Sequence, residues 1–368
     1  MNMNMYMSSL SFIMNNPTFK IFNLSNYINS YNYKYVITAF ILWFATILIC
    51  VLITNDRMRG FMPLLSDPDD LDYLGDFSNI TKEDKLLDRV LKKASMEDNT
   101  VILTVVNEAW TKPGSALDQF LESFHIGDQT VKLLDHLVIV SLDVESYKRC
   151  KSVHQHCAPL STPGIDFSMQ SNFMTDRYVK MMWRRIDFLG TVLQKGYNFI
   201  FTDADVLWFR NPLPMFHNEE DIQFSCDHYR GNPHDLKKGD PNGGFNFVKS
   251  NIRTIKFFKF WYDSRLKYPG SRTQVVLNNI KLDPYINEIG LRIRFLDTVY
   301  FGGFCEMSRD FDKVRTIHTN CCIGLNRKVL DLKAMLEDWK RFRSPTSIKN
   351  SNLGSWSVPK NCSMKPIV

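Results

Sequence analysis

Two acidic residues separated by one position follow a short apolar run, and their chemistry is that of a divalent-metal site. Residues 198–202 (NFIFT) predict a buried strand, and Asp203 and Asp205 come directly after it. In open α/β sheets, ligands bind beyond the carboxyl ends of the strands. Two carboxylates there can hold Mg²⁺ or Mn²⁺, and such an ion neutralises the charge on a departing diphosphate. The alternative is a solvated turn that caps the next segment.

A phosphatase of the haloacid dehalogenase type is a second interpretation of the same residues. Those enzymes use an apolar strand that ends in Asp-x-Asp, and the first acid, here Asp203, would be the nucleophile. They place this strand at the start of the domain, whereas two strands and three helices are predicted before Asp203. They also need a later acidic pair for Mg²⁺, and Gly239-Asp240 has no second acid nearby. Both observations count against the phosphatase.

The elements around the motif predict one α/β domain. Apolar runs predict strands at 101–106, 137–142, 198–202, 221–225, 245–249 and 291–296. Helical periodicity predicts helices at 115–125, 176–195, 252–265, 274–281 and 328–341, and an earlier one that follows a capping box at Thr81-Lys82-Glu83-Asp84. Because strands alternate with helices, we expect a mostly parallel sheet that is covered on both faces.

The cysteines allow either disulfides or a metal. Cys150, His154, His156 and Cys157 could form a zinc cluster, but a Cys150–Cys157 disulfide is favoured. Cys321 and Cys322 are adjacent, so each needs a distant partner. The candidates are Cys226, Cys305 and Cys362, and the connectivity stays open.

An uncharged stretch near the amino terminus predicts a membrane anchor. Residues 35–55 carry no charge and are mostly apolar, and a bilayer-spanning helix needs about 20 such residues. The charges on the two sides of this stretch are nearly balanced. Two N-glycosylation sequons, at Asn79 and Asn361, and the cysteines after the anchor favour a lumenal body. The net charge of +6 is spread along the chain, which indicates no binding of nucleic acid.

These features divide the chain into five predicted parts. They are a disordered cytosolic tail at 1–34, a transmembrane signal anchor at 35–55, a stem at 56–80, a catalytic domain at 81–345 and a C-terminal tail at 346–368.

Several longer strings point to one family. They are Asn107-Glu108-Ala109-Trp110, Pro113-Gly114-Ser115, Met181-Met182-Trp183-Arg184-Arg185, Phe201-Thr202-Asp203-Ala204-Asp205-Val206-Leu207-Trp208-Phe209-Arg210-Asn211-Pro212, Pro241-Asn242-Gly243-Gly244-Phe245, Gly302-Gly303-Phe304-Cys305-Glu306 and His318-Thr319-Asn320-Cys321-Cys322. With them, the stretch from Thr100 to Phe342 resembles the plant nucleotide-diphospho-sugar transferase family, grouped with family 77 glycosyltransferases.

This resemblance implies a GT-A glycosyltransferase fold, a Rossmann-like mostly parallel sheet behind the single anchor helix. It implies a metal-dependent, configuration-retaining transfer in the Golgi lumen, from a nucleotide sugar, expected to be UDP-linked, to a glycan or glycoprotein. Asp203, Asp205 and His318 would hold Mn²⁺ or Mg²⁺. The residues expected to contact the donor are Thr104, Asn107, Arg185, Asn242, Gly243 and Gly244. A homo-oligomer is compatible with this reading.

One departure from the family pattern concerns the catalytic residues. The family usually shows Asp-Gln-Asp where this chain has Thr273-Gln274-Val275. Gln274 is therefore grouped with Asp203 and Asp205 as a catalytic candidate. Because both acids are absent, a weakened protein that binds a nucleotide sugar without transferring it is the alternative to the enzyme.

Overall fold

The computed structural model describes residues 80–168, 175–344 and 355–362, together with five helical residues of the predicted anchor, Thr38, Leu42, Trp43, Phe44 and Thr46. The chain forms two units, Met1–Met62 and Pro63–Val368. The predicted tail at 1–34, the rest of the anchor at 35–55 and the stem up to residue 79 lie outside the described residues. Among the described residues, no helix combines the length and the apolar character needed to cross a bilayer.

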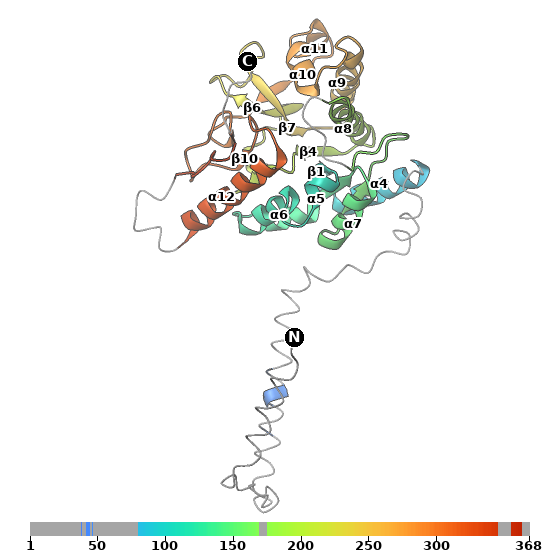
Figure 1. The fold of residues 1–368 in the computed structure, drawn as a ribbon. Helices are drawn as coiled ribbons and strands as arrows, with labels where there is room; N and C mark the ends of the chain where they lie inside the picture. Colours follow the sequence, from blue (N-terminus) through green and yellow to red (C-terminus); the bar gives the residue numbers. More distant parts are fainter. Residues whose placement is uncertain are drawn as a thin grey trace, which may run out of the picture. The chain divides into compact units, whose positions relative to one another are not determined.

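The described residues of the second unit, called the body, are built on a seven-stranded sheet in the order β3-β2-β1-β4-β7-β6-β8 (Figure 1). The strands are β1 (Thr100–Val106), β2 (Leu137–Ser141), β3 (Cys157–Pro159), β4 (Asn198–Thr202), β6 (Ile222–His228), β7 (Asp240–Val248) and β8 (Ile293–Phe295). Within this sheet β7 runs antiparallel to β4 and β6, and the other neighbours are parallel. The prediction of an α/β fold with a mostly parallel sheet is confirmed.

A smaller sheet explains how distant residues meet. It has the order β5-β10-β9 and consists of β5 (Val206–Trp208), β9 (Phe301–Gly303) and β10 (Thr316–His318). β10 pairs antiparallel with β5, and the register sets His318 opposite Val206. Because Val206 follows Asp205 directly, this pairing carries His318 to the Asp-x-Asp turn.

Nine α-helices of the body surround the sheets. They are α4 (Ile80–Ala94), α5 (Glu108–Thr111), α6 (Ala116–Ile126), α7 (Val144–Val153), α8 (Asp176–Gln194), α9 (Ile252–Asp263), α10 (Thr273–Ile280), α11 (Pro284–Glu288) and α12 (Leu325–Arg343). α8 packs beside α9, and α12 beside α6 (Figure 1). The apolar stripe predicted for α8 is buried, and Gly196 follows the helix with a φ of +85°. A residue with a side chain would be strained there.

The predicted capping box at Thr81-Lys82-Glu83-Asp84 is wrong. α4 already begins at Ile80, so Thr81 lies inside the helix. Glu83 is instead buried, and its carboxylate accepts hydrogen bonds from the backbone N–H of Ser161 at 3.0 Å and from the Ser161 hydroxyl at 2.6 Å. Asp84, the acid that would have closed the box, forms an ion pair with Lys195 at 2.7 Å instead.

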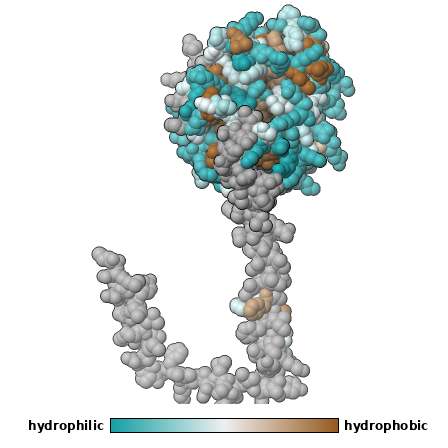
Figure 2. All heavy atoms as spheres, turned by 90° about the vertical axis from the view of Figure 1, so that its right-hand side faces the viewer, coloured by the Kyte–Doolittle hydropathy of each residue, from teal (hydrophilic) through white to brown (hydrophobic). Residues whose placement is uncertain are grey.

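Aromatic side chains fill much of the core. Trp208 is fully buried, its ring stacks on Phe124 at 4.7 Å, and Trp183 is 7 % exposed. The face of the body in Figure 2 is mostly hydrophilic, with apolar side chains in small separate groups. Such scattered exposure is ordinary for a folded domain.

Three disulfides link the cysteines of the body. The predicted Cys150–Cys157 bond is present, and because the two sulfurs are bonded to each other they cannot hold zinc. The neighbouring residues Cys321 and Cys322 form disulfides with Cys305 and Cys362, respectively. Cys226 is a buried free thiol, and burial raises its pKa above the ordinary thiol value.

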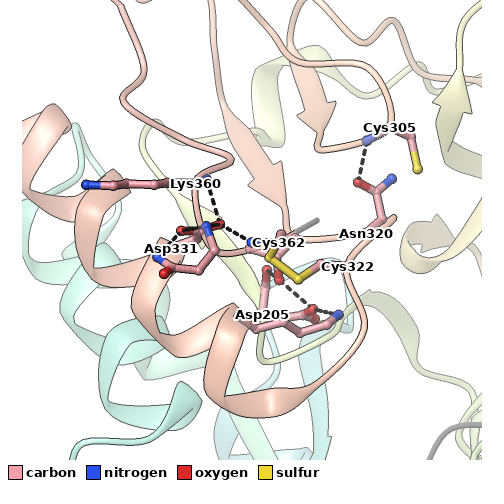
Figure 3. The surroundings of a disulfide bond; sticks show 10 residues. Asp205, Cys305, Asn320, Cys322, Asp331, Lys360 and Cys362 are labelled. Atoms are coloured by element: carbon pink, nitrogen blue, oxygen red, sulfur yellow. Dashed lines mark hydrogen bonds and ion pairs between the residues drawn. A yellow bond between two sulfur atoms is a disulfide. The ribbon is translucent and has the colours of Figure 1, made fainter. Parts of the chain in front are cut away.

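Part of the predicted C-terminal tail packs against the body. Residues 355–362, called the strap, are tied to α12 through Asp331, whose fully buried carboxylate accepts hydrogen bonds from the backbone N–H groups of Lys360, Asn361 and Cys362 (Figure 3). Trp356 of the strap stacks on Phe311 with ring centroids 4.1 Å apart. The strap is thus a folded part of the domain.

Asp331→Ala is expected to lower the free energy of unfolding by about 2–4 kcal/mol, because three strap N–H groups lose a charged acceptor. Chemical denaturation of the purified body measures this. Lys333→Ala, on an exposed position of the same helix, is the matched control and should change little. Equal stability of the two variants would mean that the strap does not depend on Asp331.

Candidate active site

The Asp-x-Asp turn lies at the carboxyl end of the central strand β4. The backbone N–H of Asp203 donates to the carbonyl of Gly244 on β7 at 2.7 Å, and the N–H of Val206 donates back to the Asp203 carbonyl at 3.0 Å. These two bonds fix a tight turn between β4 and β5. Both carboxylates therefore leave the same edge of the sheet, where parallel strands place ligand sites.

His318 completes a three-ligand cluster with the two acids. Its Nε2 lies 3.3 Å from Asp205 Oδ1 and 3.9 Å from Asp203 Oδ2. All three ligand atoms lie within 4.8 Å of one another. An ion about 2.1 Å from each ligand holds neighbouring ligands roughly 3–3.5 Å apart, so these separations fit one divalent ion with small adjustments.

The remaining carboxylate oxygens are held by the protein. Arg185 Nη1 lies 2.7 Å from Asp203 Oδ1. Asp205 Oδ2 accepts from Lys328 Nζ at 2.5 Å and from the Thr319 hydroxyl at 2.8 Å. Each acid thus has one oxygen bound to cationic or hydroxyl donors and the other directed toward His318. This arrangement suits metal ligands, because the held oxygen fixes the orientation of each carboxylate before an ion binds.

Arg184 and Arg185 point in different directions from α8, as expected for neighbours on one helix. Arg185 is buried, and its guanidinium lies 4.8 Å from the centroid of the Phe201 ring. Arg184 pairs with Asp187 at 2.9 Å on the surface side of the helix. Arg185 is therefore the arginine that reaches the site.

The surroundings of the two acids shift their pKa values in opposite directions. Burial raises the pKa of Asp203 above the usual carboxyl range; Arg185 opposes this rise, and the charge on Asp205 adds to it. Burial would also raise the pKa of Asp205, but Lys328 and His318 outweigh it and hold that pKa well below the ordinary value. The neighbouring cations thus favour the ionised form of Asp205.

Gly244 makes room for the cluster. A Cβ atom there would lie 2.5 Å from Cε1 of His318 and 2.6 Å from Oδ2 of Asp203, closer than real side chains approach. At the neighbouring Gly243 a Cβ would meet its nearest atom, Gln274 Oε1, at an ordinary 3.5 Å. The ligand atoms can converge only because position 244 lacks a side chain.

A cavity of about 260 Å³ opens beside the acids. Its wall combines the end of β1, one face of α8 and the start of α12. The lining includes Val105, Val106, Asn107, Trp110, Tyr178, Met181, Arg185, Asp203, Asp205, Gly324 and Lys328. Of the predicted donor contacts, Asn107 and Arg185 line the cavity. Thr104 is fully buried in β1 and does not, and Asn242, Gly243 and Gly244 are not part of the lining either.

Gln274 and Asn242 hold β7 beside the cluster. The backbone N–H of Gly243 donates to Gln274 Oε1 at 2.8 Å, and Gln274 Nε2 donates to the carbonyl of Pro241. Asn242 Oδ1 accepts from the N–H of Gly244 at 2.8 Å. Both ends of the Gln274 amide therefore bind backbone, which makes it a positioning residue for β7. Its neighbours are the buried Thr273 and the partly exposed Val275.

Lys328 is a site residue that the sequence reasoning missed. It occupies the first turn of α12, where the helix dipole disfavours a positive charge. A lysine in that position was the available signal, because it indicates a nearby anion. Asp205 is that anion, although it lies 123 positions earlier in the chain.

A carboxylate pair and an imidazole that could hold a metal ion lie beside a cavity that Arg185 and Lys328 line. A family model described as nucleotide-diphospho-sugar transferase matches residues 132–332, more than half of the chain. The chain belongs to the nucleotide-diphospho-sugar transferase family and is a glycosyltransferase. The phosphatase interpretation of Asp203 is therefore wrong.

Individual relatives span most of the body. An uncharacterized protein of Arabidopsis thaliana is 50 % identical over 279 residues, 76 % of this chain and 74 % of that protein. The Arabidopsis thaliana UDP-D-xylose:L-fucose alpha-1,3-D-xylosyltransferase MGP4 is 21 % identical over 67 % of this chain and 69 % of its own. The UDP-galactose:fucoside alpha-3-galactosyltransferase of Dictyostelium discoideum is 39 % identical over 37 % of this chain and 24 % of its own. The solved galactosyltransferase LgtC is 12 % identical, with a TM-score of 0.39, over 65 % of this chain and 98 % of that one.

Gly244→Ala is expected to weaken Mn²⁺ binding by about 10- to 100-fold, because the added methyl displaces His318 and Asp203. Gly243→Ala is the matched control one residue away and should bind Mn²⁺ normally. Calorimetric titration of Mn²⁺ into each folded variant makes the comparison. If both variants bind the ion like the wild type, the cluster is not its site.

Proposed function

We propose that the protein is a metal-dependent, configuration-retaining glycosyltransferase that moves a sugar from a UDP-linked donor to a glycan or glycoprotein. The observation that carries this proposal is the convergence of Asp203, Asp205 and His318 beside a cavity that Arg185 and Lys328 flank. The UDP moiety and the glycan acceptor are supported by relatives whose names specify UDP-xylose or UDP-galactose and a fucose or fucoside acceptor.

The charge balance favours a nucleotide diphosphate. Arg185 and Lys328 neutralise the two carboxylates, and a divalent ion between the carboxylates leaves two positive charges in excess. A nucleotide sugar carries two negative charges on its diphosphate, so the loaded site and the donor are complementary. The apolar part of the cavity, with Trp110, Tyr178 and Met181, is suited to the nucleobase and ribose.

Asp203, Asp205 and His318 would hold the metal. When bound, the ion supplies Lewis-acid stabilisation of the leaving diphosphate. Arg185 and Lys328 keep the carboxylates oriented and add positive charge where the leaving group gathers negative charge. An imidazole is a better ligand for Mn²⁺ than for Mg²⁺, so we expect a preference for Mn²⁺.

A nucleotide-sugar-binding protein without turnover is the second candidate. It is favoured by one observation, the absence of a carboxylate on either side of Gln274, where Thr273 is buried and Val275 is apolar. Donor hydrolysis by the purified body with Mn²⁺ separates the two functions, because a binding protein releases no UDP.

His318→Ala is expected to raise the Mn²⁺ concentration for half-maximal donor hydrolysis by at least about tenfold, since one of three protein ligands is lost. UDP released from UDP-galactose and UDP-xylose, followed against Mn²⁺ and Mg²⁺, provides the measurement. His234→Ala, at an exposed histidine far along the chain, is the control. A folded His318→Ala variant with an unchanged Mn²⁺ requirement would show that His318 only packs in the core.

The proposed location is the Golgi membrane, with a single type II anchor at 35–55 and a lumenal body. The apolar stretch and the three disulfides of the body support this proposal. The Asn361 amide donates to Asp331 at 2.7 Å, and its neighbour Cys362 is disulfide-bonded, so folding competes with modification at that sequon.

We therefore expect N-glycosylation at Asn79 and an unmodified Asn361 in the folded protein. Glycosidase treatment should increase gel mobility, and Asn79→Gln should abolish that change whereas Asn361→Gln should not. Digestion of the body by protease added to sealed vesicles would contradict the lumenal orientation.

A further inference from the structure

Asp227 lies across β7 from the metal cluster. β4 and β6 flank β7 and run in the same direction, with Phe201 and Phe224 both opposite Asn246. Asp203 follows Phe201, and Asp227 follows Phe224, so both acids emerge at the same edge of the sheet. The β6–β7 register shifts after Phe224 and again after Cys226, so Asp227 lies beside the start of β7, near Pro241 and Asp240.

Two amides converge on one oxygen of Asp227. Its Oδ1 accepts from Asn242 Nδ2 at 2.6 Å and from Asn320 Nδ2 at 2.8 Å. Within the described part of the chain, Oδ2 accepts no hydrogen bond. The half-buried carboxylate is thus fixed in place by one oxygen while the other stays open to a ligand.

The two amides belong to the frame of the metal cluster. Asn242 Oδ1 accepts from the N–H of Gly244, which adjoins Asp203 and His318. Asn320 follows His318 by two residues, and its Oδ1 accepts from the N–H of Cys305 at 3.1 Å (Figure 3). Both asparagine side chains use both of their polar atoms, so the orientation of Asp227 is coupled to that of the cluster.

Other acids near this edge are occupied. Glu306 Oε2 accepts from the N–H of Tyr229 at 2.6 Å and from the Thr298 hydroxyl at 2.9 Å. Asp240 lies 3.6 Å from the guanidinium of Arg230. Asp227 differs from both acids, because one of its oxygens is tied to the frame of the metal cluster and the other accepts no hydrogen bond from the described residues.

On the basis of the proposed function, we infer that Asp227 Oδ2 accepts a hydrogen bond from a hydroxyl of the transferred sugar. A diphosphate on a metal held by Asp203 and Asp205 would carry its sugar toward the start of β7, where the half-buried Gly243 has no side chain to cover the backbone. Asn242 links Gly244 to Asp227, so a sugar hydroxyl held over this end of β7 would come within reach of Oδ2. Hydrogen bonds to a carboxylate are stronger than neutral ones, which makes Asp227 a specificity-determining contact for the donor sugar.

The test compares binding of UDP, UDP-galactose and UDP-xylose to the full body with Mn²⁺ by calorimetry. Asp227→Asn keeps Oδ1 as an acceptor for both asparagines and replaces Oδ2 by a donor. We expect UDP affinity to stay within about twofold and the affinity for at least one nucleotide sugar to fall by about 10- to 100-fold. Asp240→Asn, which removes a neighbouring carboxylate from the same hairpin, should leave all three affinities unchanged.

Three outcomes overturn the inference. Equal losses for UDP and for the nucleotide sugars would make Asp227 a support of the metal cluster only. Unchanged donor binding with a raised acceptor KM would assign Asp227 to the acceptor. Unchanged donor affinities and an unchanged acceptor KM would mean that Asp227 has a structural role only. Failure of the wild-type body to bind UDP with Mn²⁺ is a separate result, because it contradicts the proposed function itself.

Discussion

The burial of two carboxylates one residue apart is the constraint on which the site depends. Asp205 is 1 % exposed, and an isolated ionised carboxylate at such a depth would be strongly destabilising. Lys328 from α12 and Arg185 from α8 offset this cost, so two helices far apart in sequence must both dock at the turn after β4. The position of α12 depends in turn on the strap and on the pairing of β10 with β5. Removal of either cation would leave a carboxylate uncompensated, and we regard the helix packing as organised around this electrostatic requirement.

The direction of β7 explains why backbone groups, as well as side chains, reach the site. β4 and β6 bring their carboxyl ends to the active edge, and the antiparallel β7 brings its amino-terminal residues, Asn242 to Gly244, to the same place. An all-parallel arrangement would put the other end of β7 there and take the two glycines away from Asp203 and His318. Gln274 holds this strand end by binding its backbone at Gly243 and Pro241. The antiparallel strand β7 therefore lies between the metal ligands and Asp227.

Local patterns in the sequence predicted the elements that local interactions determine. β4 has the predicted bounds, and α8 differs by one residue, because a buried apolar run and a helical stripe are both visible in a short window. Residues joined only by long-range pairing could not be found this way. Lys328 approaches Asp205 through tertiary packing, and His318 was placed by family resemblance, whereas the β5–β10 register is its physical cause. Family resemblance also placed Thr104 among the donor contacts, but Thr104 lies too deep in β1, since the cavity wall begins at Val105.

The Cys322–Cys362 bond has a consequence for biosynthesis. Cys322 lies in the cavity wall, and its partner is synthesised 40 residues later. A nascent chain can pair its strands before that residue leaves the ribosome, but until then the wall is held by non-covalent contacts alone. The covalent closure of the wall thus waits for Cys362 and requires an oxidant for the thiols. In a reducing environment, newly made molecules would have a folded sheet but no Cys322–Cys362 bond in the cavity wall. Activity would then begin only after this bond is oxidised.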